Sequence, residues 1–187
     1  MKQYNILDYG AIADGVTNNA ATIQQAIDEA SVEGGRVVIP QGRYLSGTLI
    51  LKSNIDFHLE KGAVLVSSLN EEDILDFARL FDDDNACTGW DGGCFLFACH
   101  EENITISGEG IIYGQGDKVF IDDDVDGGAH ECPLSVTAFR PRTTFLEDVT
   151  NLTVRDITIQ DAAFWTLHMA GCHHVRVQDI KILNDVR

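Results

Sequence analysis

The feature that most constrains the fold of this chain is an internal repeat of roughly 23–24 residues. Four stretches, which start at Ser53, Glu102, Asn151 and His174, share one layout. In each stretch a polar residue leads into a short alternating strand, and a second alternating strand follows after a polar or glycine break. A repeat of this length with two short strands per unit predicts a solenoid.

A parallel β-helix is the solenoid that fits this repeat, because each coil wraps once and pairs its strands with the coils above and below. The spaced leucines of a leucine-rich repeat are absent. Asn54, Asn103 and Asn151 recur at one place in the repeat. Because asparagine tolerates left-handed backbone angles, we expect these residues at bends, with their amides stacked as a ladder. The two Asn-x-Thr sequences at Asn103 and Asn151 are therefore interpreted as structural.

One helix is expected near the start, over about residues 17–30, where apolar residues recur at three- and four-residue spacing. Thr17, Asn18 or Asn19 could cap its start, and Gly34-Gly35 would stop it. The rest of the chain predicts short strands in coils that run over about residues 36–187. These strands are expected at residues 37–39, 48–51, 55–59, 63–66, 104–107, 111–113, 152–154, 157–159, 175–177 and 180–183.

The two ends of the predicted solenoid differ. The helix is placed to cover the N-terminal end, whereas the repeat continues to the last residues without a second cap. Because an uncovered strand edge promotes aggregation, we expect residues 1–187 to be the N-terminal part of a single β-helix domain, truncated at its C-terminal end. The alternative is that another chain covers this edge. Acidic insertions at 70–93 and 116–132 interrupt the coils and are expected to be binding loops.

The charge balance excludes several partners. Thirteen Lys and Arg residues against thirty Asp and Glu give a formal net charge of −17. Such a surface repels nucleic acid and anionic membranes, so neither is expected as a partner. The first residues lack the apolar stretch of a secretory signal. We therefore expect a cytoplasmic protein, or a secreted or periplasmic one if a signal was trimmed.

Metal sites are not expected either. The five cysteines include no Cys-x-x-Cys pair, so they predict reduced thiols instead of structural zinc. The run Asp122–Gly127 matches the first half of a calcium loop. The loop needs a glutamate six residues after its glycine, where this chain has Pro133. We therefore expect a solvated acidic loop, with no metal and no cofactor.

Two short segments could contact a sugar. Asp161 follows a strand and precedes a segment that contains Trp165 and His168, which could supply a stacking platform and a polar contact. The alternative is that Trp165 belongs to the core and His168 is its neighbour. The basic segment Arg140-Pro141-Arg142 could hold a carboxylate through paired hydrogen bonds, or could be a surface turn.

Longer motifs resemble a known family. The N-terminal pattern DYGA-x-x-DG, the helix, and GG-x-V-x-IP-x-G-x-Y-x-x-G resemble the opening of the pectate-lyase-like superfamily of right-handed parallel β-helices. The later part is similar to glycoside hydrolase family 28, the polygalacturonase family. The segments that carry this similarity are Gly114–Gly116, Arg140-Pro141, Phe164–His168 and Cys172–Val175.

The resemblance implies hydrolysis of galacturonosyl links in pectin-type saccharides, with inversion. The family's Asn-Thr-Asp and Asp-Asp segments do not occur in the right context within residues 1–187, so the catalytic aspartates are expected beyond Arg187 and the chain alone is expected to be inactive. Trp165, His168, Arg140 and Asp161 remain as candidate substrate-binding residues. Two alternatives stay open, namely a lyase that uses calcium and an arginine base, and a non-catalytic β-helical module that binds carbohydrate or acts as an adhesin. Oligomeric state is not predicted.

Overall fold

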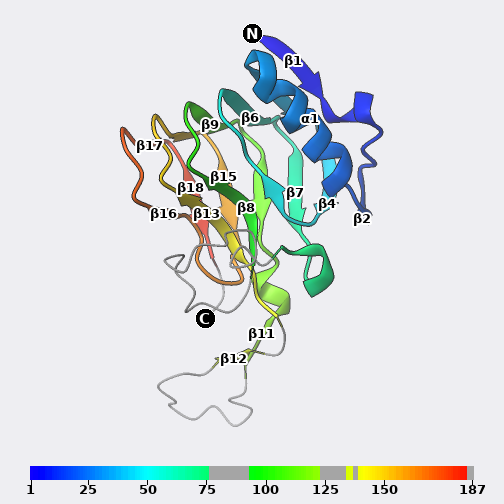
Figure 1. Ribbon diagram of the computed structural model, residues 1–187. Helices are drawn as coiled ribbons and strands as arrows, with labels where there is room; N and C mark the ends of the chain where they lie inside the picture. The colour runs from blue at the N-terminus through cyan, green and yellow to red at the C-terminus, as the bar shows by residue number, and fades with distance from the viewer. Residues whose placement is uncertain (76–92, 123–133, 137–138, 185–187) are drawn as a thin grey trace.

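Three parallel sheets run along the molecule in the computed structural model, which describes residues 1–75, 93–122, 134–136 and 139–184 (Figure 1). The first sheet contains, in spatial order, β1 (Lys2–Asn5), β3 (Gly35–Ile39), β6 (Ile55–Leu59), β9 (Ile104–Ser107), β14 (Thr153–Arg155) and β17 (Arg176–Gln178). The second contains β2 (Asp14–Asn18), β4 (Gly42–Ser46), β7 (Ala63–Ser67), β10 (Ile111–Tyr113), β15 (Thr158–Gln160) and β18 (Lys181–Leu183). The third contains β5 (Leu49–Ile50), β8 (Cys94–Cys99), β13 (Arg142–Glu147) and β16 (His168–Ala170).

Smaller elements lie between these strands. An antiparallel pair is formed by β11 (Phe120–Asp122) and β12 (Leu134–Val136). Short 3-10 helices cover Ile6–Tyr9, Glu71–Asp73 and Gly116–Lys118. In the part of the chain that the structure describes, no helix has the length and apolar character needed to cross a membrane.

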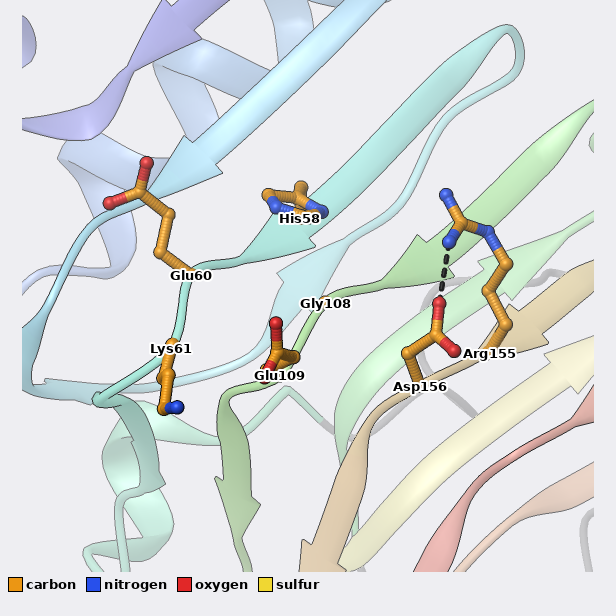
Figure 2. A pocket seen from close by; sticks show the side chains of 7 residues that line it. All are labelled: His58, Glu60, Lys61, Gly108, Glu109, Arg155 and Asp156. Atoms are coloured by element: carbon orange, nitrogen blue, oxygen red, sulfur yellow. Dashed lines mark hydrogen bonds and ion pairs between the residues drawn. The ribbon is translucent and has the colours of Figure 1, made fainter.

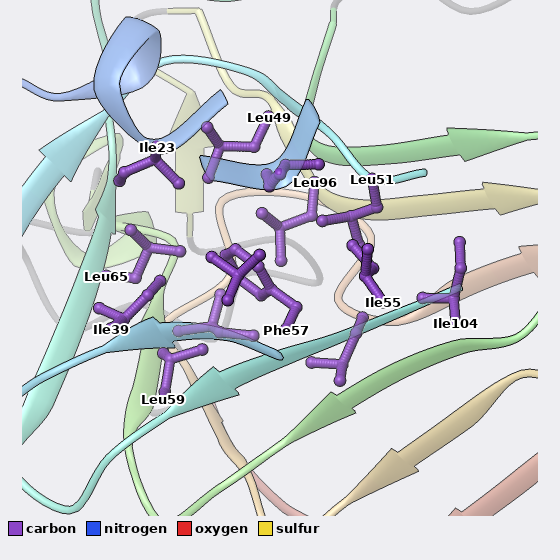
Figure 3. Close-up of a cluster of buried hydrophobic side chains, with 14 of the residues drawn as sticks. Ile23, Ile39, Leu49, Leu51, Ile55, Phe57, Leu59, Leu65, Leu96 and Ile104 are labelled. Carbon is purple, nitrogen blue, oxygen red and sulfur yellow. The ribbon is translucent and has the colours of Figure 1, made fainter. Parts of the chain in front are cut away.

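The register between coils confirms the predicted fold, a right-handed parallel β-helix with an N-terminal capping helix. One apolar column crosses the whole first sheet, because residues at equivalent positions in successive coils pair directly. Its members are Tyr4, Val37, Phe57, Ile106, Val154 and Val177. All but Val177 are buried. Stacked coils therefore generate the continuous core shown in part in Figure 3.

The predicted asparagine ladder is confirmed. Asn103 donates from Nδ2 to Asn54 Oδ1 at 2.9 Å, and Asn151 donates in the same way to Asn103 Oδ1 at 2.9 Å. His174 continues the row, with its Nδ1 3.2 Å from Asn151 Oδ1. All four residues have φ between 53° and 65°, in the left-handed region where asparagine is favoured. The side chains therefore connect the bends of four successive coils.

The helix α1 (Ala20–Glu33) covers the N-terminal end of the core, as predicted, but it begins and ends three residues later than predicted. Its apolar face buries Ile23, Ala26, Ile27 and Ala30. Asn19 precedes the helix without capping it, because its side chain bonds instead to the backbone of Ile12, Thr17 and Leu45. The amide thus joins the helix start to the neighbouring coil.

The prediction of two strands per coil is wrong, because most coils have a third strand in the third sheet. Of that sheet, only β5 corresponds to a predicted strand. In β8 both faces are buried: Phe95 and Leu96 belong to the main core, whereas Cys94 and Phe97 form a separate cluster with Phe145. A strand buried on both faces reads as a continuous apolar run without alternation, so the period-2 pattern that revealed the other strands is missing.

Candidate functional site

The outward face of the third sheet carries a row of rings built by the coil register. Phe97 of β8 pairs with Phe145 of β13, which pairs with His168 of β16. The ring centroids are 5.9 Å apart for Phe97 and Phe145, and 4.6 Å apart for Phe145 and His168. Trp165 extends the row, with its centroid 4.2 Å from that of His168. The β-helix therefore places His168 between a buried ring and a Trp165 side chain that is 41% exposed.

His168 is held by its backbone and has one buried ring nitrogen. Its backbone N–H donates to Thr144 Oγ1 at 3.1 Å, and its Nδ1 is buried without a hydrogen-bond partner among the described residues. Burial lowers the pKa of His168 below its usual 6.5, and the nearby charge of Arg142 lowers this pKa further. The imidazole is therefore neutral near pH 7, when one ring nitrogen can accept a hydrogen bond and the other can donate one.

Two guanidinium groups lie beside this row of rings. Arg140 and Arg142 have their guanidinium carbons 4.4 Å and 5.5 Å from the ring centroid of Phe164. That ring lies 6.2 Å from Trp165. Arg142 is 2% exposed, whereas Arg140 is only partly buried. The cations and rings therefore form one patch at the start of β13 and β16, in which Arg140 is the cation closer to solvent.

Asp161 lies at a different place, on the corner after β15 of the second sheet. It is buried, has φ 46°, and accepts a hydrogen bond from Gln160 Nε2 at 2.9 Å through its own Oδ2. Gly114 and Gly116 pack against this corner so closely that a Cβ on either would meet the Asp161 carbonyl oxygen at 2.9 Å. The segment Gly114–Gly116 is thus explained by the packing of one coil on the next.

The structure therefore brings three of the four predicted residues, Trp165, His168 and Arg140, to one patch and places Asp161 on the preceding corner. Sequence reasoning did not assign a role to Phe145, and it named Phe164 and Arg142 only as members of the segments 164–168 and 140–142. The pairing of Phe145 with His168 depends on the coil register, which a single sequence does not reveal. Arg142 follows Arg140 by two positions, a spacing that places both on one face of an extended segment.

Metal ligands and thiols were also considered. Among the described residues, no group of three or more His, Cys, Asp or Glu side chains is placed to hold a metal ion. The acidic run that begins at Asp122 falls mostly outside the described residues. Cys94, Cys99 and Cys172 are free thiols. Burial raises the pKa of Cys99 to about 12, and the adjacent Glu147 carboxylate adds to this effect, so Cys99 is no nucleophile at neutral pH.

Comparisons with known proteins agree with the parallel β-helix fold. A family model described as rhamnogalacturonase A/epimerase, pectate lyase-like, matches residues 3–70. Among solved structures, a protein from Parabacteroides merdae assigned to the glycosyl hydrolases superposes with a TM-score of 0.75 at 30% identity, over 97% of this chain and 75% of that one.

Two curated relatives point to different roles. The exo-poly-alpha-D-galacturonosidase of Dickeya chrysanthemi is 36% identical over 131 residues, which are 63% of this chain and 20% of that protein. Plasmin and fibronectin-binding protein A of Streptococcus pneumoniae is 28% identical over 193 residues, covering 96% of this chain and 24% of that protein. The chain thus spans no more than about a quarter of either relative.

Proposed function

The chain belongs to the pectate-lyase-like superfamily, and on that premise we propose that it forms the N-terminal coils of a family 28 glycoside hydrolase. The proposed reaction is the hydrolysis of galacturonosyl links in pectin-type saccharides, with inversion. The homology to a galacturonosidase supports this reaction class. The catalytic aspartates are proposed to lie in coils beyond Arg187, because the family's aspartate segments do not occur in the right context in this chain.

The observation that carries this proposal is the patch of Arg140, Arg142, Phe164, Trp165 and His168 on the third sheet. A galacturonosyl unit has an apolar ring face, several hydroxyl groups and one carboxylate. The exposed Trp165 ring is suited to stack on the sugar face, and the Arg140 guanidinium can donate two parallel hydrogen bonds to the carboxylate. The positive charge of the patch is what an anionic saccharide needs in a chain with a net charge of −17.

The chemical step is assigned to groups outside this chain. In an inverting glycosidase one carboxylic acid protonates the leaving oxygen while a carboxylate on the other side activates water, and the two carboxyl groups lie about 6.5–9.5 Å apart. The part played by residues 140–168 is to bind and orient the saccharide. His168, neutral near pH 7, contributes a hydrogen bond to a sugar hydroxyl without adding charge.

Calorimetric titration of the purified chain with tri-galacturonate tests this proposal. Arg140→Gln is expected to weaken binding by about tenfold or more, because a charge-assisted hydrogen bond contributes about 1.5–3 kcal/mol. Arg176→Gln makes the same charge change at an exposed residue of β17 on the first sheet, and it is expected to leave the affinity within about twofold, as screening of surface charges predicts. Equal losses in both variants would contradict a specific role for Arg140.

Product analysis separates the rival functions. The chain alone is expected to release no reducing ends from polygalacturonate, and robust turnover would contradict the placement of the catalytic aspartates. Unsaturated products that absorb ultraviolet light and disappear on chelation would indicate a calcium-dependent lyase. The similarity to a plasmin- and fibronectin-binding protein favours a non-catalytic adhesin as the second candidate. Oligogalacturonate binding without turnover by a verified full-length product would support that role.

A further inference from the structure

A pocket lies at the turn between the first and second sheets, apart from the third-sheet patch. It has a volume of about 710 Å³ and is lined by His58, Glu60, Lys61, Gly108, Glu109, Arg155 and Asp156 (Figure 2). These residues come from three successive coils, at the ends of β6, β9 and β14. His58 and Gly108 are at least partly buried, whereas Glu60, Lys61 and Glu109 are exposed around them.

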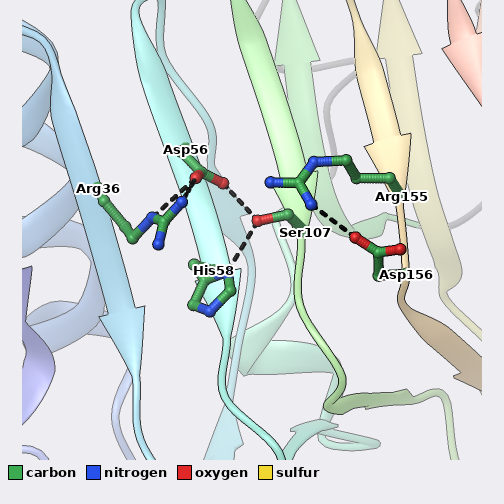
Figure 4. Close-up of polar contacts among 6 residues, drawn as sticks. All are labelled: Arg36, Asp56, His58, Ser107, Arg155 and Asp156. Atoms are coloured by element: carbon green, nitrogen blue, oxygen red, sulfur yellow. Dashed lines mark hydrogen bonds and ion pairs between the residues drawn. The ribbon is translucent and has the colours of Figure 1, made fainter. Parts of the chain in front are cut away.

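The protonation of His58 follows from the hydrogen bonds behind the pocket (Figure 4). Ser107 Oγ lies 2.6 Å from Asp56 Oδ1 and 2.8 Å from His58 Nδ1. Asp56 is buried and ion-paired with Arg36 at 2.7 Å, so its carboxylate can only accept. The single Ser107 proton therefore goes to Asp56, and His58 Nδ1 must carry the proton that Ser107 Oγ accepts.

This arrangement leaves Nε2 of neutral His58 as an acceptor toward the pocket. A neutral imidazole has one N–H, which here is on Nδ1, so Nε2 presents its lone pair. Burial lowers the pKa of His58 below 6.5, and the charge of Arg36 acts in the same direction. The ring is therefore neutral near pH 7.

The other charges around the pocket favour a ligand that donates hydrogen bonds. Glu60 and Glu109 offer carboxylate acceptors. The Arg155 guanidinium is ion-paired with Asp156 at 2.5 Å. The other charged lining residues are one cation, Lys61, and two carboxylates, Glu60 and Glu109. An anion would meet this excess of negative charge, whereas the hydroxyl groups of an uncharged sugar would find three acceptors.

We propose that this pocket binds a neutral sugar, whose hydroxyl groups donate to His58 Nε2 and to the carboxylates of Glu60 and Glu109. The site would give the chain a second saccharide contact, of opposite charge preference to the third-sheet patch. Ser107 does not act as a nucleophile, because it is fully buried and its hydroxyl donates its proton to Asp56. Arg36, Asp56 and Ser107 are positioning residues, because their contacts fix the proton on His58 Nδ1 and leave Nε2 as the acceptor.

Nuclear magnetic resonance of the isotope-labelled chain at about pH 7.5, well above the ordinary pKa of histidine, tests this site. The chain is titrated with the methyl glycosides of galactose, arabinose, rhamnose and xylose, and separately with galacturonate. At least one neutral glycoside is expected to shift the amides of Gly108 and Glu109 with millimolar affinity, and galacturonate to shift them less. Absence of these shifts with all four neutral glycosides would overturn the proposal.

Two variants identify the acceptors. His58→Asn keeps an N–H that can donate to Ser107 but has no acceptor at the Nε2 position, so the neutral glycoside should bind about fivefold more weakly, the effect of one neutral hydrogen bond. Glu109→Gln should weaken the neutral glycoside and strengthen galacturonate. Glu71→Gln, a matched charge change at an exposed residue outside the pocket, should alter neither.

The remaining outcomes also decide the matter. Unchanged affinity in His58→Asn, or a preference for galacturonate in the unmodified chain, would contradict the assigned acceptors. Zn²⁺ binding that depends on His58 would assign the pocket to a metal instead. Because Arg140→Gln changes only the third-sheet patch, it should leave glycoside shifts at Gly108 intact, which distinguishes failure of this proposal from failure of the proposed function.

Discussion

His168 of the third-sheet patch is expected to make the stability of the fold depend on pH. Its pKa is lowered in the folded chain, chiefly by burial and then by Arg142, so the unfolded chain binds the proton more tightly. Its contribution to the free energy of unfolding is therefore intact above the unfolded pKa of about 6.5 and is lost as the pH falls below it. We expect the melting temperature to fall less between about pH 7.5 and 5.5 in His168→Gln than in the unmodified chain.

The change in melting temperature between the two pH values is compared for each protein separately. The loss of ring packing in His168→Gln lowers both melting temperatures and therefore cancels. Gln178→Ala, at an exposed residue of β17 without a titratable side chain, is the control and should keep the pH dependence of the unmodified chain. An identical slope in all three proteins would contradict the burial of an uncharged His168.

Cys99 provides a second residue-scale prediction. Its pKa of about 12, raised by burial and by the Glu147 carboxylate, leaves little thiolate at pH 8.5. Iodoacetamide at that pH should therefore modify Cys99 at least about tenfold more slowly in the folded chain than in urea, because the thiolate is the reacting species. Mass spectrometry of the modified peptides measures both rates, and equal rates would contradict this prediction.

The asparagine ladder is the element whose contribution can be divided into two parts. Asn103 has φ 56° and takes part in two amide hydrogen bonds, one to Asn54 and one from Asn151. Asn103→Ala should destabilise the chain by about 2–5 kcal/mol, from about 1–2 kcal/mol of left-handed strain together with the two lost hydrogen bonds of about 0.5–1.5 kcal/mol each. Asn103→Gly removes the hydrogen bonds but relieves the strain, so it should be the milder change.

Urea unfolding measures both variants. A glycine variant as unstable as the alanine variant would show that the ladder bonds, and not the backbone angle, account for the whole effect. Equal stability of all three proteins would contradict any contribution from the ladder.

Sequence patterns predicted most closely the strands that have one face in the core. β6, β9 and β10 have the predicted bounds, because their alternation is regular and Gly, Asn or Asp stands at their ends. In the third sheet, β8 and β13 escaped prediction because both of their faces are buried, as Phe95 and Phe97 in β8 show. This sheet positions the candidate patch, so the same failure hid the contacts of His168.

The hydrogen-bond partners of polar side chains were predicted less well than the positions of left-handed bends. Left-handed backbone at Asn54 follows from residue type alone, whereas the role of Asn19 depends on which backbone atoms the next coil brings near it. The pocket around His58 was missed for a similar reason. Ser107 lies 49 residues away in the sequence and reaches His58 only through the stacking of β6 and β9.

For the whole molecule, the net charge of −17 sets how an anionic saccharide approaches the patch. Long-range repulsion opposes the encounter, and salt screens it over a Debye length of about 10 Å at 0.1 M. The association rate of tri-galacturonate should therefore rise between about 0.01 and 0.1 M salt, the reverse of the behaviour of a basic protein that attracts an anion. Stopped-flow fluorescence of the tryptophans measures this rate, and a fall with salt would show that the local charge of Arg140 and Arg142 dominates.

The two ends of the solenoid should also differ in local stability. Val154 and Ile159 are each 1% exposed, whereas Val177 and Ile182, which pair with them one coil later, are 40% and 47% exposed. In a solenoid each coil is stabilised mainly by its neighbours, so a coil with a neighbour on one side opens at lower free energy. Backbone amides of β17 and β18 should exchange hydrogen at least about tenfold faster than those of β6 and β7.

The N-terminal strands β1 and β3 serve as the internal control for this exchange experiment, because they also lie at an end but are covered by α1, whose Ile23 and Ile27 are fully buried. Their amides should exchange slowly if a cap, and not distance from the ends, determines protection. Mass spectrometry at low protein concentration, where association between chains is suppressed, provides the measurement. Equal protection of β3 and β17 would contradict the argument, since it would mean that the exposed apolar edge of the last coil has no effect on local opening.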